Sequence, residues 1–431
     1  MSALDTPARR VDRRETRRDQ RSNAPRRSRP TALTLLVAGN AVSMTGNVIM
    51  TVAVPWLVLT TTGSAAVAGT VVFAGVASAT LGGFAAGRVV DAIGAVRASA
   101  VADLLSGLAV APLPVLLALH ALEIWMLLLL TVLGTLADAA GSAARQSLVP
   151  VAADAGGYRR EHANAQFTSA EHVGYLLGAP AAGLLVAAFG VGPALWVTVA
   201  SFAFAGIVVL RLAHLSAGRS AAAAASAAGL RETVTFIWGD PALRALVVFP
   251  TAAVLLVGPL TPLVLPVLAR VVFGDPVVLG VMVAGYGVGG LVGAVGYGVL
   301  GRRVPRRALY LGIFVVWPCA YAAILLVPSL PVTLVMLVTL GAAAGSLVPL
   351  QATIRQERSP LRLLPRVVAL STASIPIAVP TAVLVTGFLI DGLGLGRASM
   401  LLAGAAILIG LRVLTSPWTR HLDRPNGAAR T

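Results

Sequence analysis

The chain has 431 residues, of which 57% are hydrophobic and only 12% are charged. A soluble domain carries about 25% charged residues, so this composition excludes a soluble enzyme and indicates a protein that crosses a membrane several times. All 33 basic residues are arginine. The absence of lysine excludes a P-loop and covalent chemistry that needs a lysine of the chain's own.

The first segment, residues 1–30, is polar and basic. It contains ten arginines and four acidic residues, but no aromatic residue and no apolar periodicity. This composition is typical of disorder, so we expect a disordered cytoplasmic tail. The net charge of +16 is concentrated in such cytoplasmic segments, and we expect it to contact anionic lipid rather than nucleic acid.

Twelve apolar segments follow, each close to the roughly 20 residues that a helix needs to cross a bilayer core. We predict membrane helices near 33–60, 65–87, 98–119, 123–149, 167–188, 192–213, 244–267, 277–300, 308–328, 331–353, 367–390 and 396–416. They form an all-α polytopic protein with two six-helix bundles, at 31–213 and 244–416. A cytoplasmic linker at 214–243, which includes an amphipathic stretch, joins the bundles, and a cytoplasmic tail follows at 417–431.

The distribution of arginine predicts the orientation of these helices. With a cytoplasmic N-terminus, 31 arginines fall in tails, loops and helix ends on the inner side, and only Arg270 and Arg397 fall outside. Positive residues are enriched in cytoplasmic loops, and an odd number of helices would disrupt this segregation. We therefore expect both termini in the cytoplasm.

A weak internal repeat relates the two halves. A shift of 211 residues aligns Pro55 with Pro266, Gly69 with Gly280, Gly82 with Gly293, and Gly87 with Gly298. Chance matches are common in helices rich in glycine and valine. One proline and three glycines at a single offset nevertheless suggest a duplicated six-helix unit.

The loop after the second predicted helix carries Gly87, Asp91, Gly94 and Arg97. Gly87 is expected to permit close helix packing, and Gly94 can adopt a positive φ. The loop resembles the signature of the major facilitator superfamily, Gly-x-x-x-Asp-basic-x-Gly-basic-basic, with alanine at two of the basic positions. In that family the loop is a latch that stabilises one orientation of the carrier; a charged turn without this role is the alternative.

The fifth predicted helix carries Gly174, Gly178, Pro180 and Gly183. These residues resemble the exporter motif Gly-x-x-x-Gly-Pro-x-x-Gly-Gly of the same superfamily, with Ala179 inserted before the proline. Glycines four residues apart let helices approach closely, and a proline can kink a helix. The resemblance favours export, and ordinary glycine-rich packing is the alternative.

Two further segments are similar to the superfamily branch that contains drug, macrolide and siderophore exporters. One runs from Gly229 to Arg244, and the other from Ser43 to Asn47, where that branch often has aspartate at the position of Asn47. The resemblance covers nearly the whole chain after residue 30. It implies two pseudo-symmetric bundles that alternately expose a central site.

Few ionisable residues lie within the predicted spans, and we single out Asp103, Asp138 and Arg145. Charges inside a membrane are energetically costly, which makes them functional candidates. Asp138 and Arg145 are seven residues apart and share a helix face. We consider both carboxylates candidates for proton coupling, with Arg145 as the neighbour of Asp138. A structural charge pair is the alternative.

Three amides, Asn40, Asn47 and Gln351, are candidates for contact with substrate, or they bond to neighbouring helices. The histidines are scattered without the paired spacing of a metal site. We therefore expect no metal, no cofactor and no enzyme activity.

These features together predict a transporter of the bacterial inner membrane. We expect it to export a hydrophobic or amphipathic small molecule by proton antiport, and to work as a monomer surrounded by lipid. Two alternatives stay open: an uptake carrier of the same fold, and a membrane sensor or assembly factor that transports nothing.

Overall fold

The computed structural model describes residues 31–212, 230–300, 303–327, 329–360, 362–373 and 375–423. The predicted disordered tail, residues 1–30, and much of the predicted linker lie outside these ranges. Among the described residues, twelve helices are long and apolar enough to cross a membrane. Each overlaps one predicted span, so the predicted all-α polytopic fold is confirmed.

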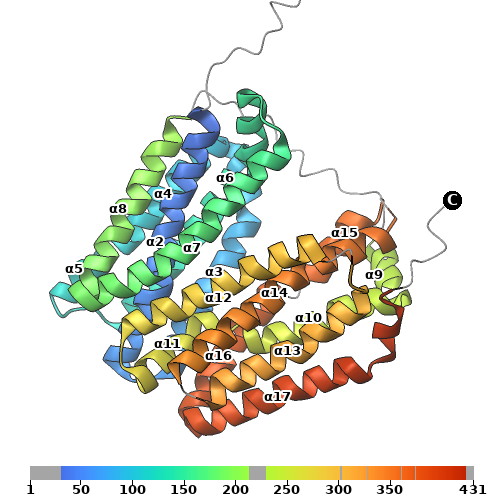
Figure 1. Ribbon diagram of the computed structural model, residues 1–431. Coiled ribbons are helices and arrows are strands. Elements are labelled where there is room, and N and C mark those ends of the chain that lie inside the picture. The colour runs from blue at the N-terminus through green and yellow to red at the C-terminus, as the bar shows by residue number, and fades with distance from the viewer. Residues whose placement is uncertain are drawn as a thin grey trace, which may run out of the picture.

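The first bundle contains six membrane spans (Figure 1). Its third span is divided in two, because Pro112 begins a new helix after Ala111. The helices of this bundle are α2 (Thr31–Thr62), α3 (Ala65–Ile93), α4 (Ala95–Val110), α5 (Pro112–Ala118), α6 (Ile124–Gly156), α7 (Arg160–Phe189) and α8 (Val191–Leu210).

The second bundle contains the other six spans. The predicted amphipathic stretch forms a short helix before it, and a 3₁₀ turn after it packs back onto the bundle, with Leu422 buried behind the turn. The elements are α9 (Leu230–Gly239), α10 (Pro241–Val257), η2 (Leu260–Val264), α11 (Leu265–Leu268), η3 (Ala269–Phe273), α12 (Pro276–Leu300), α13 (Arg306–Leu326), α14 (Leu330–Arg358), α15 (Leu364–Thr372), α16 (Ile375–Leu393), α17 (Leu395–Thr415) and η4 (Pro417–His421).

The first span of the second bundle is not one regular α-helix, although the sequence predicts a single helix at 244–267. It runs from Pro241 to Phe273 through α10, η2, α11 and η3. Pro259, Pro262 and Pro266 lie within or beside the irregular part. Proline has no N–H to donate along the helix, and the local change to π-helical bonding accommodates these gaps.

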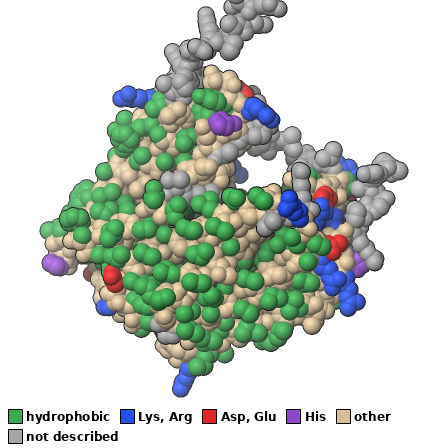
Figure 2. All heavy atoms as spheres, viewed as in Figure 1, with side chains coloured by type: hydrophobic (Ala, Val, Ile, Leu, Met, Phe, Trp, Pro, Cys, Tyr) green, Lys and Arg blue, Asp and Glu red, His purple; other side chains and the backbone are tan. Residues whose placement is uncertain are grey.

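The spans alternate in direction, so their ends gather on two faces of the molecule. We call the face where α2 begins and α17 ends the terminal face, and the other one the opposite face. The bundles diverge toward the terminal face and converge toward the opposite face (Figure 1). The space-filling view shows a hollow in the surface between them, and hydrophobic side chains spread over the outer face (Figure 2).

Two helix pairs, α3 with α16 and α7 with α12, join the bundles near the opposite face. A Cβ added at Gly69 would lie 3.1 Å from the carbonyl oxygen of Val383, and one at Gly280 would overlap the carbonyl oxygen of Ala179. Gly69 and Gly280 are aligned by the internal repeat. The repeat therefore places equivalent glycines at two equivalent contacts between the bundles.

The same repeat also appears inside each bundle. Gly82 of α3 packs against the backbone of Leu136 in α6, and Gly293 of α12 packs against the backbone of Ala342 in α14. Without side chains at these glycines the helices can approach at backbone distance. The glycines therefore hold α6 and α14 in matching places within the two bundles.

Candidate functional site

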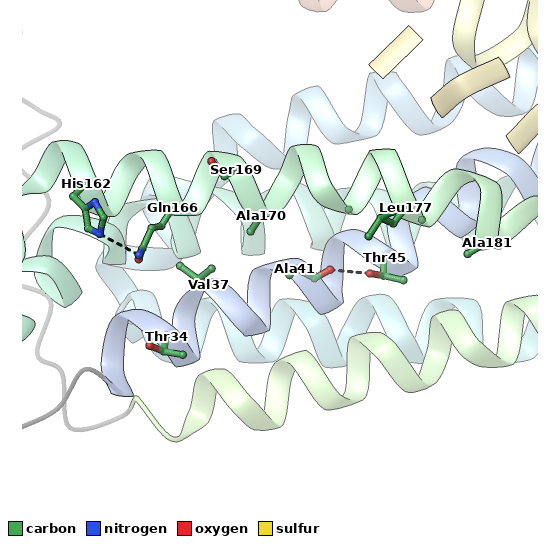
Figure 3. A pocket seen from close by; sticks show the side chains of 12 residues that line it. Thr34, Val37, Ala41, Thr45, His162, Gln166, Ser169, Ala170, Leu177 and Ala181 are labelled. Carbon is green, nitrogen blue, oxygen red and sulfur yellow. Dashed lines mark hydrogen bonds between the residues drawn. The ribbon is translucent and has the colours of Figure 1, made fainter. Parts of the chain in front are cut away.

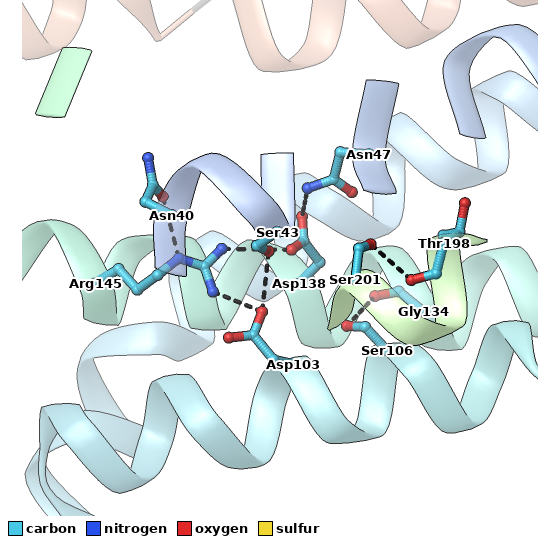
Figure 4. A network of polar contacts seen from close by, with 10 residues as sticks. All are labelled: Asn40, Ser43, Asn47, Asp103, Ser106, Gly134, Asp138, Arg145, Thr198 and Ser201. Carbon is cyan, nitrogen blue, oxygen red and sulfur yellow. Dashed lines mark hydrogen bonds and ion pairs between the residues drawn. The ribbon is translucent and has the colours of Figure 1, made fainter. Parts of the chain in front are cut away.

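A cluster of charged side chains lies inside the first bundle, where α4 and α6 face each other (Figure 4). Nη1 of Arg145 is 2.7 Å from Oδ1 of Asp103, and Nη2 of Arg145 is 3.6 Å from Oδ1 of Asp138. The side chains of Arg145 and Asp103 are buried, whereas that of Asp138 is 18% exposed. The three ionisable residues singled out in the sequence thus form one cluster.

Helix α2 supplies three neutral side chains to this cluster (Figure 4). Nε of Arg145 donates a hydrogen bond of 3.2 Å to Oδ1 of Asn40. The Ser43 hydroxyl donates to Oδ1 of Asp103 at 3.0 Å. The Asn47 amide donates to Oδ2 of Asp138 at 2.9 Å. Asn40 and Asn47 therefore bond to neighbouring helices, the second of the two roles considered for them.

The hydrogen bonding of the cluster is incomplete. Within the described part of the chain, Oδ2 of Asp103, Oδ1 of Asp138 and Nδ2 of Asn40 have no hydrogen-bond partner. Two carboxylates against one guanidinium leave a net charge of −1 when all three groups are ionised. Arg145 is closer to Asp103, so the negative charge of Asp138 is the less compensated one. Asp138 is therefore the carboxylate more available to bind a proton or a cation.

A groove of about 790 Å³ runs between α2 and α7 (Figure 3). It runs from Thr34 to Thr45 along α2 and from His162 to Ala181 along α7, and so it extends toward the terminal face, where the bundles diverge (Figure 1). Among the described lining residues, the polar side chains are hydroxyls, an amide and an imidazole. The lining residues are Thr34, Val37, Ala41, Thr45, His162, Gln166, Ser169, Ala170, Gly174, Leu177, Gly178 and Ala181.

The glycines predicted in the exporter-like motif lie at two different contacts of α7. Cβ atoms added at Gly174 and Gly178 would lie 3.3 Å and 3.2 Å from Met44 and Val48 of α2. A Cβ at Gly183 would lie 2.6 Å from the carbonyl oxygen of Pro276 in the other bundle. Close packing at all three glycines agrees with the expectation from their spacing, and Pro180 lies within the helix between them.

The predicted latch loop forms the tight turn between α3 and α4. Gly94 has a φ of 82°, as expected from its place in the motif. The expectation for Gly87 is wrong, because a Cβ there would meet no atom within 4 Å. Asp91 lies in the last turn of α3, and neither Asp91 nor Arg97 forms an ion pair with the described residues. The packing that would need a glycine at position 87 is absent where the bundles diverge.

Gln351 lies outside this cluster, in α14 of the second bundle. Its side-chain oxygen accepts a hydrogen bond from Nη2 of Arg355, one turn further along the same helix. The structure therefore does not bring Gln351 together with Asn40 and Asn47 in one polar network.

Two features of the cluster were not predicted from the sequence: the pairing of Asp103 with Arg145 and the hydrogen bond from the Ser43 hydroxyl. One signal was available: a carboxylate and a guanidinium buried in consecutive spans at the same side of the membrane each need a partner. Nothing in the sequence distinguished Asp103 from Asp138 as the nearer partner, because that choice depends on the rotation of α4 and α6.

Comparison with known proteins identifies the family of this chain. The sequence profile of the Major Facilitator Superfamily matches residues 36–301 and 260–430. The chain belongs to the major facilitator superfamily. It is a multi-pass membrane transporter and not an enzyme, as predicted.

Curated relatives within the superfamily match almost the full length. The multidrug efflux pump Tap of Mycolicibacterium fortuitum is 34% identical over 387 residues, which cover 88% of this chain and 94% of that protein. The protein of the same name from Mycobacterium tuberculosis is 31% identical over 413 residues, covering 92% and 98% of the two chains.

Solved structures share the fold at low sequence identity. The nucleoside transporter NupG aligns with a TM-score of 0.70 at 12% identity, over 89% of this chain and 98% of that chain. A D-xylose-proton symporter aligns with a TM-score of 0.65 at 15% identity, over 90% and 98%. These likenesses support the major facilitator fold of two six-helix bundles.

Proposed function

We propose that this transporter exports a hydrophobic or amphipathic small molecule in exchange for protons. The full-length similarity to proteins named as multidrug efflux pumps supports export. The groove between α2 and α7 supports the substrate class, because its described lining is largely apolar with a few hydrogen-bonding groups. Such a surface can bind apolar molecules without a fixed pattern of hydrogen bonds.

The observation that carries the proton-coupling proposal is the imbalance of the charge cluster. Arg145 lies 2.7 Å from Asp103 but 3.6 Å from Asp138, whose side chain is partly exposed and whose buried Oδ1 accepts no hydrogen bond from the described residues. A proton on Asp138 removes the net negative charge of the cluster. In the proposed cycle Asp138 takes up a proton when open to the outside and releases it into the cytoplasm.

The proposed cycle is alternating access, in which the bundles rock around the central site. The arginine distribution supports a cytoplasmic terminal face with both termini inside, in the inner membrane of a bacterium. The divergence of the bundles at that face then corresponds to an inward-open state. In the outward-open state the loop between α3 and α4 would act as the latch, through Gly87, Asp91, Gly94 and Arg97. A monomer can carry out this cycle.

Inverted membrane vesicles with an acidic lumen provide the test. Hydrophobic antibiotics and dyes are added outside while lumenal pH is recorded. The wild type is expected to release lumenal protons on addition of a transported compound, and Asp138→Asn is expected to lose this release while still binding the compound. Glu123→Gln is the matched control, because it neutralises an exposed carboxylate just before the same helix.

Three other outcomes would contradict the coupling residue, the direction of transport or transport itself. Proton release that persists in Asp138→Asn would overturn the residue assignment but keep export. Accumulation of labelled compound in right-side-out vesicles would indicate an uptake carrier. No transport of any compound by a correctly inserted protein would favour a sensor or assembly factor.

A further inference from the structure

One carboxylate connects the two bundles at the opposite face. Asp391 lies in the last turn of α16, directly beside the first turn of α3. Its Oδ1 accepts a hydrogen bond of 2.8 Å from the backbone N–H of Ala65, and its Oδ2 accepts one of 3.0 Å from the backbone N–H of Ala66. The hydroxyl of Ser64 also donates to Oδ2.

The bonds to Asp391 satisfy backbone N–H groups in the first turn of α3 that have no acceptor within the helix. The first N–H groups of a helix have no carbonyl in the preceding turn. Ser64 caps α3 locally by accepting from the N–H of Val67 at 3.1 Å, and Asp391 takes the N–H groups of Ala65 and Ala66. A negative charge is also favoured at the positive end of the helix dipole. The interaction exists only while the bundles touch at this face.

Among the described residues, the equivalent contact between the bundles has no such carboxylate. The internal repeat aligns Ser64 with Asp275 and Ala65 with Pro276. Asp275 caps its own helix α12, through a hydrogen bond of 2.7 Å from the N–H of Val277. Each of these aligned residues packs against a glycine of the other bundle, Ala65 against Gly387 and Pro276 against Gly183.

Counting four residues on from each of these two glycines gives Asp391 in α16 and Ala187 in α7. Glycine packing is therefore common to both contacts, whereas the carboxylate is present at one of them. Close packing of the bundles does not by itself require a carboxylate there.

We infer that Asp391 is a positioning residue of the transport cycle, which holds the opposite face closed by capping α3 from the other bundle. This inference rests on the proposed alternating access. When the bundles separate at this face, the N–H groups of Ala65 and Ala66 exchange the carboxylate for water, so the Asp391 bonds favour the state described here. They counteract the latch proposed for the loop between α3 and α4.

The test measures the distribution of the two states directly. Spin labels are placed at Leu119 and Val327, exposed residues at the opposite-face ends of α5 and α13, in a Cys319→Ser background. Double electron–electron resonance in lipid nanodiscs then reports separation of the bundles as a longer distance. Asp391→Ala is compared with Asp275→Ala, its matched control, which removes a helix cap that stays within one bundle.

Asp391→Ala is expected to raise the ratio of open to closed molecules at this face by about twofold to 30-fold, the range for loss of a helix cap. Asp275→Ala is expected to leave this ratio unchanged. Asp391→Asn, which keeps a hydrogen-bond acceptor, is expected to lie between Asp391→Ala and the wild type. Thermal unfolding is expected to differ little between the two alanine variants.

An unchanged distance distribution in a well-folded Asp391→Ala protein would overturn the inference. So would an equal shift in Asp275→Ala, because helix capping in general would then explain it. A wild-type protein that never populates the long distance, with or without substrate, would instead contradict the proposed alternating access. The two failures are therefore distinguishable.

Discussion

Arg145 and Asp103 form a buried ion pair with 2.7 Å between Nη1 and Oδ1, and each side chain is at most 1% exposed. Asp138 on the same helix as Arg145 is 0.9 Å farther from the guanidinium, at 3.6 Å, and is partly exposed. The two carboxylates therefore differ in their dependence on Arg145. This difference separates a structural role from a transport role in the first two predictions.

Asp103→Asn is expected to destabilise the protein strongly. The substitution removes the closest counter-charge of the buried Arg145 side chain and leaves Asp138, at 3.6 Å, as its remaining partner in the cluster. Breaking one partner of a buried ion pair costs about 3 to 5 kcal/mol. Thermal unfolding in detergent measures the effect. Glu232→Gln, which breaks the exposed pair of Glu232 with Arg362 at the surface, is the control and is expected to cost at most about 1 kcal/mol.

Asp138→Asn is expected to fold almost as well as the wild type. The amide oxygen of the new side chain can still accept from Asn47, and Arg145 keeps its bond to Asp103. Loss of stability is expected to stay near the contribution of one hydrogen bond, about 1 kcal/mol. Thermal unfolding of the same preparation used for proton release checks this. A loss as large as that of Asp103→Asn would mean that both carboxylates are structural.

Gly280→Val is expected to change the conformational balance more than the fold. A side chain at this position overlaps the backbone of Ala179 in the other bundle, so the closed contact at the opposite face is lost while each bundle stays intact. The distance between labels at Leu119 and Val327 is expected to increase, and export is expected to decrease.

Gly293→Val on the same helix is the comparison for that prediction. Its side chain would overlap the backbone of Ala342 inside one bundle, so the expected result is a lower unfolding temperature rather than a longer distance. If both valine variants unfold alike and neither shifts the label distance, the contact at Gly280 belongs to the fold and not to a moving interface.

The loop between α3 and α4 yields a prediction from its two glycines. Gly94→Ala is expected to cost about 1 to 3 kcal/mol, because a residue with a Cβ is strained at a φ of 82°. Gly87→Ala is expected to gain up to about 1 kcal/mol, because alanine is favoured inside a helix and its Cβ meets no neighbour. Thermal unfolding distinguishes the two variants.

Transport by Gly87→Ala addresses the proposed latch. In the outward-open state the loop would approach the other bundle, so a stable Gly87→Ala protein with reduced export would support the latch. Full export would indicate that position 87 needs no close approach in either state, and that the loop is an ordinary turn.

Hydrophobic run length and charge determined the larger part of the architecture. Each of the twelve spans was visible because an apolar segment of that length is stable only inside a bilayer. The positive φ of Gly94 was also predictable, because a tight turn imposes it locally and glycine adopts it without strain. Asp103, Asp138 and Arg145 were identifiable as functional candidates because a charged residue inside a membrane is costly, whatever the direction of its side chain.

Only the tertiary structure decided which of these groups meet. The pairing of Arg145 with Asp103 depends on the rotation of two helices, and the hydrogen bonds of Asp391 join residues more than 320 positions apart in the chain. Gly87 shows the converse, because its motif suggested close packing that the diverging bundles do not make here. Contacts between helices depend on rotation, depth and the state of the bundles, and none of these is encoded in the periodicity of a single segment.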